Sequence, residues 1–380
     1  MPNFKKNNIK FFYQNNDKRI ISKIYKNFKE DNWVNGNIIK SFENDFKQKL
    51  KTNSHACSCN SGTDALKLAI LLDRDKSKDI YLTTPYSYIA TSSVVKFLNL
   101  NIIYIDVEKD NFLLDLNKLE YFLENSPINI KKRIKGIIFV ELFGNTTDLP
   151  RLKKIAKKNR LTLIGDCAQS FGTKFKNHST CNYYDYSAYS FYPTKMLSAY
   201  GDSGMLMIKD EKKLKKALLL KNNGHGEENK DHCQILGINS RMDSIQAFIL
   251  KEQLKTVNKV KKKKKIIFDY YNKEFKNLLS KPIFNKDNKS NNYIYTFYLP
   301  QKCKIKFLNY MKKNNIECKA YYNSLLAENN LLKSETQNPL TNALYNKKNL
   351  ICLPSNEKLK ITEIYKVSKL VKQFIFNHPY

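Results

Sequence analysis

Short apolar segments alternate with helical patterns between residues 55 and 208, and this alternation limits the possible folds more than any other feature of the chain. Segments of strand length lie just before residue 60 and at residues 79–84, 101–107, 135–142 and 161–166. Between them, apolar residues recur at helical spacing in residues 89–98, 116–124 and 149–159. Parallel strands need a crossover segment of this kind. The pattern therefore predicts an α/β fold with a mostly parallel sheet.

The remainder of the chain predicts a second, smaller unit. An arm and a first helix are expected in residues 1–30, and further elements at 38–50, 186–192, 205–208 and from about 243 into a lysine run at 261–265. From about residue 282 the pattern changes to an antiparallel-looking strand at 293–299 and helices at 307–314 and 361–376. A chain of 380 residues is long enough for two domains. We expect a large domain at residues 1–255, with an N-terminal arm, and a small domain at 256–380.

Residues 186–201 (YSAYSFYPTKMLSAYG) hold one charged side chain, Lys195, in a chain otherwise crowded with lysine. An uncharged, aromatic setting desolvates an ammonium group, so we expect a lowered pKa and a neutral amine at Lys195. A neutral amine attacks carbonyl groups, as Schiff-base enzymes require. The alternative is a lysine at the edge of the core whose charged end reaches water.

A candidate anion site lies at residues 60–64 (NSGTD), between the first strand and a strongly apolar helix. Small residues and a glycine at a helix N-terminus leave backbone N–H groups free, and the helix dipole favours an anion there. The alternative is an ordinary N-cap by Ser61 or Thr63. The segment is neither a Walker A loop nor a GxGxxG loop.

Asp166 ends the apolar segment at residues 161–166, and Gln169 follows three residues later. Ligands of parallel α/β sheets bind at the carboxyl ends of the strands. A carboxylate at such an end is either a functional group or an N-cap for the next turn. Because Lys195 also follows a predicted strand, Asp166 and Lys195 can face one cleft.

The formal net charge of +32 comes mostly from lysines that are spread along the chain. A basic chain attracts phosphates, including those of nucleotides and nucleic acids. The sequence has no arginine-rich or RGG segment, so we expect no specific nucleic-acid partner. The lysine run at 261–265 predicts a solvated helix face.

The eight cysteines are scattered, without a CxxC pair or a His/Cys cluster at zinc spacing, so we expect reduced thiols and no metal site. The N-terminus has no apolar signal segment, and no apolar run has the length of a membrane span. These features predict a cytoplasmic protein without a membrane partner.

Several blocks together resemble the DegT/DnrJ/EryC1/StrS family of pyridoxal-phosphate-dependent sugar aminotransferases. The blocks are SGTDAL (61–66), TPYSYIAT (84–91), GDCAQSFG (165–172), SFYPTK (190–195), AYGDSG (199–204) and GINSRMDSIQA (237–247). They occur in the family's order, and the resemblance covers roughly residues 30–375. It implies the fold-type I, aspartate aminotransferase-like architecture. In that architecture a large domain surrounds a seven-stranded, mixed, mostly parallel sheet, a small C-terminal α/β domain follows, and a homodimer shares its active sites between subunits.

The resemblance also implies roles for individual residues. Lys195 matches the lysine that forms a Schiff base with pyridoxal phosphate and moves the proton between cofactor and substrate. Asp166 matches the acid that pairs with the pyridinium nitrogen, Gln169 the residue beside the ring's O3′, and Tyr88 the aromatic residue stacked on the ring. Gln169 differs from many relatives, which have histidine there. The phosphate would be held by Gly62, Thr63, Ser190 and, from the other subunit, Asn239.

The implied reaction transfers an amino group from glutamate to a keto group of a dTDP- or UDP-linked sugar, through the pyridoxamine phosphate form of the cofactor. The blocks at 84–91, 167–172 and 237–243 are most similar to those of members that act on 3-keto or 4-keto sugars, and of these two we favour the 3-keto sugars. The product would serve surface glycan, lipopolysaccharide or capsule synthesis. One alternative is a non-catalytic or regulatory member that binds the cofactor or a sugar nucleotide without turnover. A basic nucleic-acid-binding protein is the other.

Overall fold

The computed structural model describes residues 8–14, 17–27, 32–226 and 231–378. Parts of the expected N-terminal arm and of the polar loop around residue 228 lie outside the described residues. A seven-stranded sheet runs through the molecule in the order β1-β9-β8-β5-β4-β2-β3. Its strands are β1 (His55–Cys59), β2 (Ile80–Thr83), β3 (Asn101–Tyr104), β4 (Ile134–Val140), β5 (Thr162–Asp166), β8 (Tyr186–Ser190) and β9 (Gly204–Ile208).

The sheet is mixed and mostly parallel, which confirms the predicted fold class. Neighbours among β2, β3, β4, β5 and β8 pair in parallel, and β9 pairs antiparallel with both β8 and β1. Alternate strand residues enter two separate hydrophobic clusters, since Ile137 and Phe139 belong to one and Ile138 to the other. A strand buried on both faces has consecutive apolar residues instead of an alternating pattern, as the IIFV part of β4 does.

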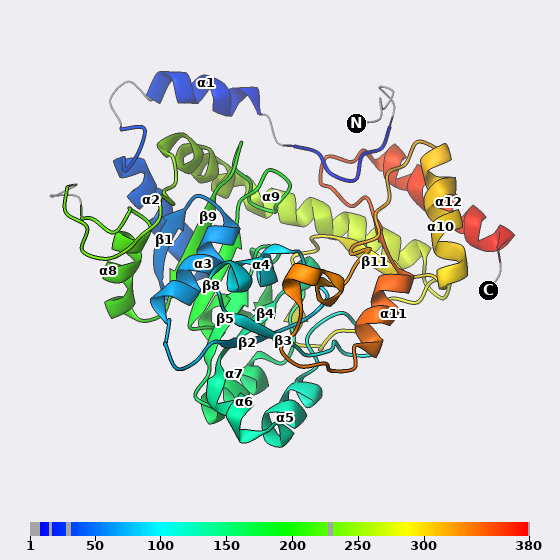
Figure 1. Ribbon diagram of the computed structural model, residues 1–380. Helices are drawn as coiled ribbons and strands as arrows, with labels where there is room; N and C mark the ends of the chain where they lie inside the picture. The colour runs from blue at the N-terminus through cyan, green and yellow to red at the C-terminus, as the bar shows by residue number, and fades with distance from the viewer. Residues whose placement is uncertain (1–7, 15–16, 28–31, 227–230, 379–380) are drawn as a thin grey trace.

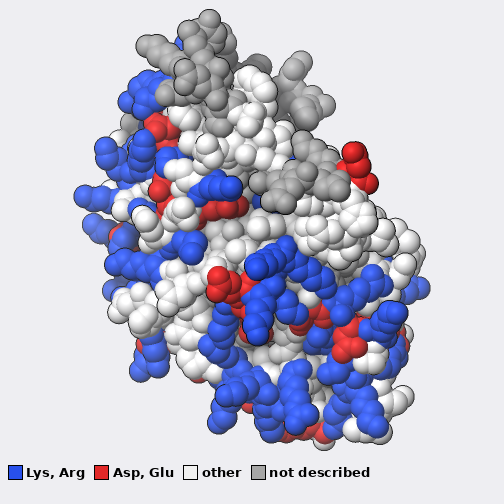
Figure 2. Space-filling model, turned by 90° about the vertical axis from the view of Figure 1, so that its left-hand side faces the viewer, with Lys and Arg blue, Asp and Glu red and all other residues white. Residues whose placement is uncertain are grey.

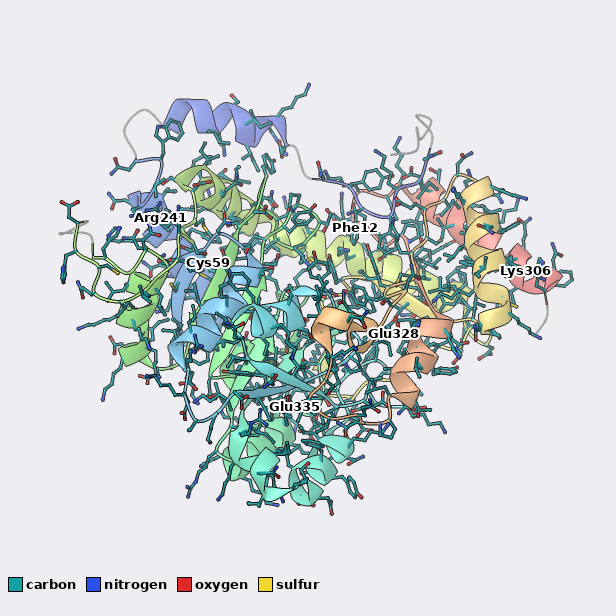
Figure 3. The ribbon with its side chains drawn as sticks, in the orientation of Figure 1. Phe12, Cys59, Arg241, Lys306, Glu328 and Glu335 are labelled. Carbon is teal, nitrogen blue, oxygen red and sulfur yellow. The ribbon has the colours of Figure 1, made fainter. Side chains whose placement is uncertain are left out.

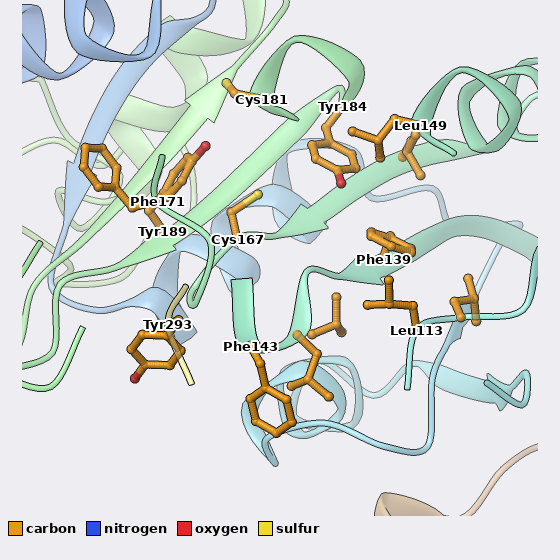
Figure 4. Packing of buried hydrophobic residues seen from close by; sticks show 14 of the residues in the cluster. Leu113, Phe139, Phe143, Leu149, Cys167, Phe171, Cys181, Tyr184, Tyr189 and Tyr293 are labelled. Atoms are coloured by element: carbon orange, nitrogen blue, oxygen red, sulfur yellow. The ribbon is translucent and has the colours of Figure 1, made fainter. Parts of the chain in front are cut away.

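Helices cover both faces of the sheet (Figure 1). One cluster includes residues of α2 (Asn37–Leu50), α5 (Leu116–Asn125), α7 (Leu149–Lys158) and α9 (Ser244–Glu274), and Figure 4 shows part of its packing. The other includes residues of α3 (Gly62–Leu72), α4 (Ala90–Phe97) and α8 (Glu211–Leu220). The short helices α1 (Lys18–Asn27) and α6 (Ile128–Arg133) add to the exterior. The sheet therefore forms the middle layer of three.

A third hydrophobic cluster supports the C-terminal unit. Here β11 (Tyr295–Tyr298) pairs antiparallel with β12 (Leu350–Leu353), and α10 (Gln301–Lys313), α11 (Thr341–Asn349) and α12 (Ile361–Asn377) surround the pair. A small sheet of β10 (Asn288–Lys289), β6 (Lys174–Phe175) and β7 (His178–Ser179) joins this unit to the large one. The division proposed at residue 255 falls inside α9, so the two units share that helix.

Some predicted elements need correction. The predicted strands at 101–107 and 186–192 end earlier, at Tyr104 and Ser190. Tyr192 leaves the sheet and lines a cavity instead. The C-terminal helix predicted at 307–314 begins at Gln301.

The lysine run at 261–265 is only partly solvated, so its interpretation as a solvated face was wrong for two of its members. Lys264 is 5% exposed, and Lys261 donates a hydrogen bond of 2.9 Å to the Gly172 carbonyl. The other three lysines are exposed. Five consecutive residues of an α-helix turn through more than one full revolution, so some must face the protein.

The surface is strongly basic. Figure 2 shows Lys and Arg side chains over much of one face, with Asp and Glu side chains among them. The described residues contain no helix long and apolar enough to cross a bilayer. Nor do they hold a group of three or more His, Cys, Asp or Glu side chains placed for a metal ion, and all eight cysteines are free thiols.

Candidate active site

A cavity of about 500 Å³ lies where several strands of the large sheet end. The carboxyl ends of β4, β5 and β8 supply Val140, Asp166 and Ser190 to its wall. Other parts of the wall come from the start of α3, from the segments after β2, β5 and β8, and from aromatic residues at distant positions. The lining includes Phe12, Ser61, Gly62, Thr63, Ser87, Tyr88, Phe143, Asp166, Gln169, Ser190, Thr194, Lys195, Asp202, Tyr293, Tyr321 and Tyr322.

The first turn of α3 forms one side of the cavity. Ser61 caps this helix, since its Oγ accepts a hydrogen bond from Asp64 N at 3.0 Å and its carbonyl oxygen accepts one from Ala65 N at 2.9 Å. The N–H groups of Gly62 and Thr63 have no acceptor within the helix. They lie at the positive end of the helix dipole and at the cavity wall. The cap by Ser61 leaves the N–H groups of Gly62 and Thr63 available, so the two interpretations of this segment do not exclude each other.

Gly62 is required for close packing at this turn. A Cβ atom at Gly62 would lie 2.7 Å from the Cβ of Ser190, a contact that folded proteins do not tolerate. The glycine thus lets the end of β8 approach the start of α3. Ser190 and the first turn of α3 can then face the same anion.

Asp166 lies on the cavity floor and is 6% exposed. Its Oδ2 accepts a hydrogen bond of 2.8 Å from Thr91 Oγ1, and its Oδ1 accepts one of 3.2 Å from Ala168 N. Burial raises the pKa of the Asp166 carboxyl, whereas these hydrogen bonds and the charge of Lys195 act in the opposite direction. A buried carboxylate with two donors still has unused acceptor capacity towards a cationic group in the cavity.

Lys195 follows β8 in a tight turn, with its N–H bonded to the Tyr192 carbonyl at 2.8 Å. Its Nζ lies 5.6 Å from the centroid of the Tyr293 ring. Burial lowers the pKa of Lys195 to about 8, and the nearby charge of Asp166 opposes this effect. The expected lowered pKa is therefore confirmed, and a large fraction of the amine is neutral near pH 8.

Gln169 and Tyr88 lie on other walls. The Gln169 amide is fixed at both ends, since its Oε1 accepts from Phe143 N at 2.8 Å and its Nε2 donates to Tyr322 Oη at 3.1 Å. Tyr88 lines the cavity and is 58% exposed, so its ring is available to a planar ligand. Seven of the eight predicted site residues thus line one cavity.

Asn239 is the exception. It is exposed and lines a separate small pocket together with Asn60, Arg241 and Asp243. In Figure 3, Arg241 lies well away from Phe12, which lines the main cavity. Within one protomer the structure does not bring Asn239 to the site.

Several residues at the site were not anticipated from the sequence. Thr91 lies three residues after Tyr88 in the block at 84–91, so helical spacing offered a signal for it. Tyr293, Tyr321 and Tyr322 come from the C-terminal unit, and no local pattern marks them. Tyr293 and Phe143 both line the cavity, and Figure 4 labels both side chains.

The cavity has the groups that pyridoxal phosphate requires. The orphan N–H groups at α3, with the close approach that Gly62 permits, suit a phosphate. Asp166 offers a buried carboxylate to a protonated ring nitrogen, and Lys195 offers an amine to an aldehyde. The residues present therefore fit this cofactor.

A family profile matches the chain over most of its length, and a curated relative matches about half of it. The profile of the DegT/DnrJ/EryC1/StrS aminotransferase family matches residues 14–372. A UDP-N-acetyl-3-dehydro-alpha-D-glucosamine 3-aminotransferase from Acidithiobacillus ferrooxidans is 32% identical over 200 residues, which are 53% of this chain and 52% of that protein. The match thus spans about half of that relative's length.

Solved structures show the same fold. A DegT/DnrJ/EryC1/StrS aminotransferase from Brucella abortus superposes with a TM-score of 0.86 at 25% identity, over 94% of each chain. NtdA from Bacillus subtilis, solved with bound cofactor PMP, has a TM-score of 0.86 at 20% identity, over 98% of this chain and 87% of that one. With the profile match from residue 14 to residue 372, these findings show that the chain belongs to the DegT/DnrJ/EryC1/StrS aminotransferase family.

Proposed function

We propose that the protein is a pyridoxal-phosphate-dependent aminotransferase that acts on a nucleotide-linked keto-sugar. The observation that carries the proposal is the placement of Lys195, Asp166 and the free N–H groups of the α3 N-terminus around one cavity. When bound, pyridoxal phosphate supplies an electron sink for bond breaking at the substrate carbon. The catalytic residues are Lys195 and Asp166, and the other cofactor contacts are Gly62, Thr63, Tyr88, Gln169 and Ser190.

Each residue has a task that its surroundings support. Asp166 holds a positive charge at the ring nitrogen, because its buried carboxylate is already oriented by Thr91 and Ala168. Lys195 takes a proton from the substrate carbon and returns it, because a pKa of about 8 lets its amine act as base and then as acid. Tyr293 and Phe12 bound the cavity and limit the water around that amine.

The proposed donor is glutamate, and the proposed acceptor is a 3-keto sugar linked to UDP or dTDP. The relative from Acidithiobacillus ferrooxidans is named for a UDP-linked 3-dehydro sugar, which supports the 3-keto assignment. The basic surface suits a diphosphate. We further propose that the product is used for surface glycan, lipopolysaccharide or capsule synthesis, and that the enzyme works in the cytoplasm as its free thiols suggest.

We also propose a homodimer with shared active sites. Asn239 is exposed and lies outside the cavity of its own protomer, so a partner's phosphate site is a place where it can act. Under this proposal, Asn239→Ala lowers cofactor affinity in the dimer although the residue does not reach the cavity of its own chain. A mixed dimer of one Asn239→Ala subunit and one Lys195→Ala subunit tests whether the active sites are shared. If they are, both substitutions fall in the same active site and the other active site is intact.

The experiment that tests the reaction is a half-reaction with glutamate. The protein loaded with pyridoxal phosphate is mixed with L-glutamate, and the cofactor absorption and 2-oxoglutarate are followed. We expect stoichiometric conversion to the pyridoxamine form, followed by amination of a UDP- or dTDP-linked 3-keto sugar. Binding of cofactor without conversion would favour a non-catalytic or regulatory member. Absence of cofactor together with steeply salt-dependent DNA binding would favour a nucleic-acid-binding protein.

A further inference from the structure

A second lysine lies close to the same aromatic ring as Lys195. The Lys264 Nζ is 5.7 Å from the centroid of the Tyr293 ring, and the Lys195 Nζ is 5.6 Å from it. Lys264 belongs to α9 and is 5% exposed, in contrast to the exposed lysine next to it, Lys263. Tyr293, which lines the cavity, therefore lies next to both lysine amines.

Lys264 is held by two backbone carbonyl groups. Its Nζ donates hydrogen bonds of 3.0 Å to the carbonyl oxygens of Tyr293 and Ser355. The Ser355 Oγ in turn accepts a hydrogen bond of 3.1 Å from Tyr295 N. One side chain of α9 thus joins the segment before β11 to the segment after β12.

The same segment is anchored at its other end to the cavity loop. Asn291 Nδ2 donates to the carbonyl oxygens of Gln169 and Phe171, at 2.9 and 3.1 Å. Tyr293 lies between this anchor and Lys264, and its ring stacks on Phe12 at 6.1 Å between centroids. The position of the Tyr293 ring is therefore set by the Asn291 anchor on one side of it in the chain and by Lys264, which binds the Tyr293 carbonyl group.

We propose that Lys264 is a positioning residue for Lys195, because its hydrogen bond to the Tyr293 carbonyl holds the Tyr293 ring against the Lys195 amine and keeps that amine poorly hydrated. The importance of this amine rests on the proposed function. Its ionisation, however, is a property of the chain that can be measured without any reaction. A tyrosine ring cannot replace the hydration that an ammonium group has in water, so contact with the ring disfavours the charged form of Lys195.

Other charged and titratable groups nearby also affect the balance between the charged and neutral forms of the two lysines. Asp166 and Asp202 belong to the cavity wall with Lys195, and Asp166 favours the ammonium form. The Tyr322 phenol lines the same cavity, and burial raises its pKa, so it stays neutral. Glu357 lies on the side of Lys264 and favours the charged form of that lysine. Removal of Lys264 leaves these groups in place, so a change in the pKa of Lys195 can be assigned to the loss of Lys264.

The test measures the ionisation of Lys195 in the full chain without added cofactor. An amine-reactive label such as trinitrobenzenesulfonate is applied across pH 6–10, and mass spectrometry quantifies labelling of the peptide that contains Lys195. In Lys264→Met we expect the midpoint of the pH profile of Lys195 labelling to rise by about half a pH unit or more. Labelling of Lys195 at pH 7.5 should then slow about threefold. Lys264→Arg, which keeps charge and donors, should stay close to the parent protein.

Lys263→Met is the matched control, because it removes a neighbouring exposed lysine from the same helix. It should leave the midpoint of Lys195 unchanged. Should Lys264→Met not fold, Tyr293→Leu removes the ring while the backbone acceptor remains, and the same upward change is expected. An unchanged Lys195 midpoint in folded Lys264→Met, or in Tyr293→Leu, would overturn the proposal. Loss of the aminotransferase reaction alone would not, since the label reads the amine directly.

Discussion

The hydroxyl of Thr91 donates a hydrogen bond of 2.8 Å to the carboxylate of Asp166, and it thereby links the first turn of α4 to the carboxyl end of β5. The Thr91 hydroxyl also lies 2.8 Å from Ser87 Oγ. A hydroxyl that is already oriented by a neighbour fixes the carboxylate more firmly than a free one. Thr91 therefore sets the direction in which Asp166 faces the cavity.

Thr91→Val should lower kcat/KM about tenfold or more, because a hydrogen bond to a charged group contributes about 1.5–3 kcal/mol. Steady-state kinetics with glutamate measures the effect. The pKa of Asp166, which burial already raises, should rise further when this donor is lost. Thr91→Ser keeps the hydroxyl and serves as control. Equal activity of the valine and serine variants would contradict the role of Thr91.

Asp166→Asn should retain the fold and lose most turnover. Asparagine has the same shape, and its side-chain oxygen can still accept from Thr91, but it carries no charge for a protonated ring nitrogen. We expect kcat to fall on the order of 10²-fold or more, while circular dichroism and the melting temperature stay close to the parent values. Full turnover in the asparagine variant would show that the carboxylate is not the partner of the ring nitrogen.

Gly62→Ala should weaken cofactor binding. The added Cβ would lie 2.7 Å from Ser190 Cβ, so the start of α3 and the end of β8 must separate. Such overpacking costs about 1–3 kcal/mol, and the dissociation constant for pyridoxal phosphate, measured by fluorescence titration, should rise accordingly. Gly226→Ala is the control, because the nearest atom to its added Cβ is 3.7 Å away. A parent-like dissociation constant for Gly62→Ala would exclude a tight cradle at this turn.

Lys195→Met should stabilise the cofactor-free protein at low pH. Because burial lowers the pKa of Lys195 from 10.5 to about 8, the unfolded chain binds more protons between these values and stability rises with pH across that interval. At pH 6 the charged, buried amine lowers the free energy of unfolding by up to about 3 kcal/mol. The advantage of the methionine variant in urea unfolding should shrink by roughly 2 kcal/mol between pH 6 and pH 9.5. A constant difference would mean that Lys195 titrates normally.

The sequence predicted the sheet because its strands are buried on both faces and its crossovers are helical. β4 and β5 therefore stood out as apolar runs, and Asp166 was correctly placed at a strand end. Lys195 was recognisable because the residues around it in the sequence are aromatic and uncharged. In these places local sequence and tertiary structure agree.

Other features depend on contacts between distant residues. The pairing of β12 with β11 joins segments more than 50 residues apart, and neither strand shows its partner in its own pattern. The burial of Lys264 follows from the carbonyl groups of Tyr293 and Ser355, which no inspection of a lysine run could reveal. The position of Asn239 outside the cavity likewise depends on how the chain folds around it.

The most direct measurement is of the covalent link between cofactor and protein. The full-length protein is loaded with pyridoxal phosphate, reduced with borohydride and digested, and the peptides are analysed by mass spectrometry. We predict a phosphopyridoxyl group on the peptide that contains Lys195, and its loss in Lys195→Ala. Lys264, whose pKa is also lowered to about 8 by burial, provides an internal comparison and should stay unmodified. Attachment at other lysines, or no attachment at all, would contradict the assignment of Lys195.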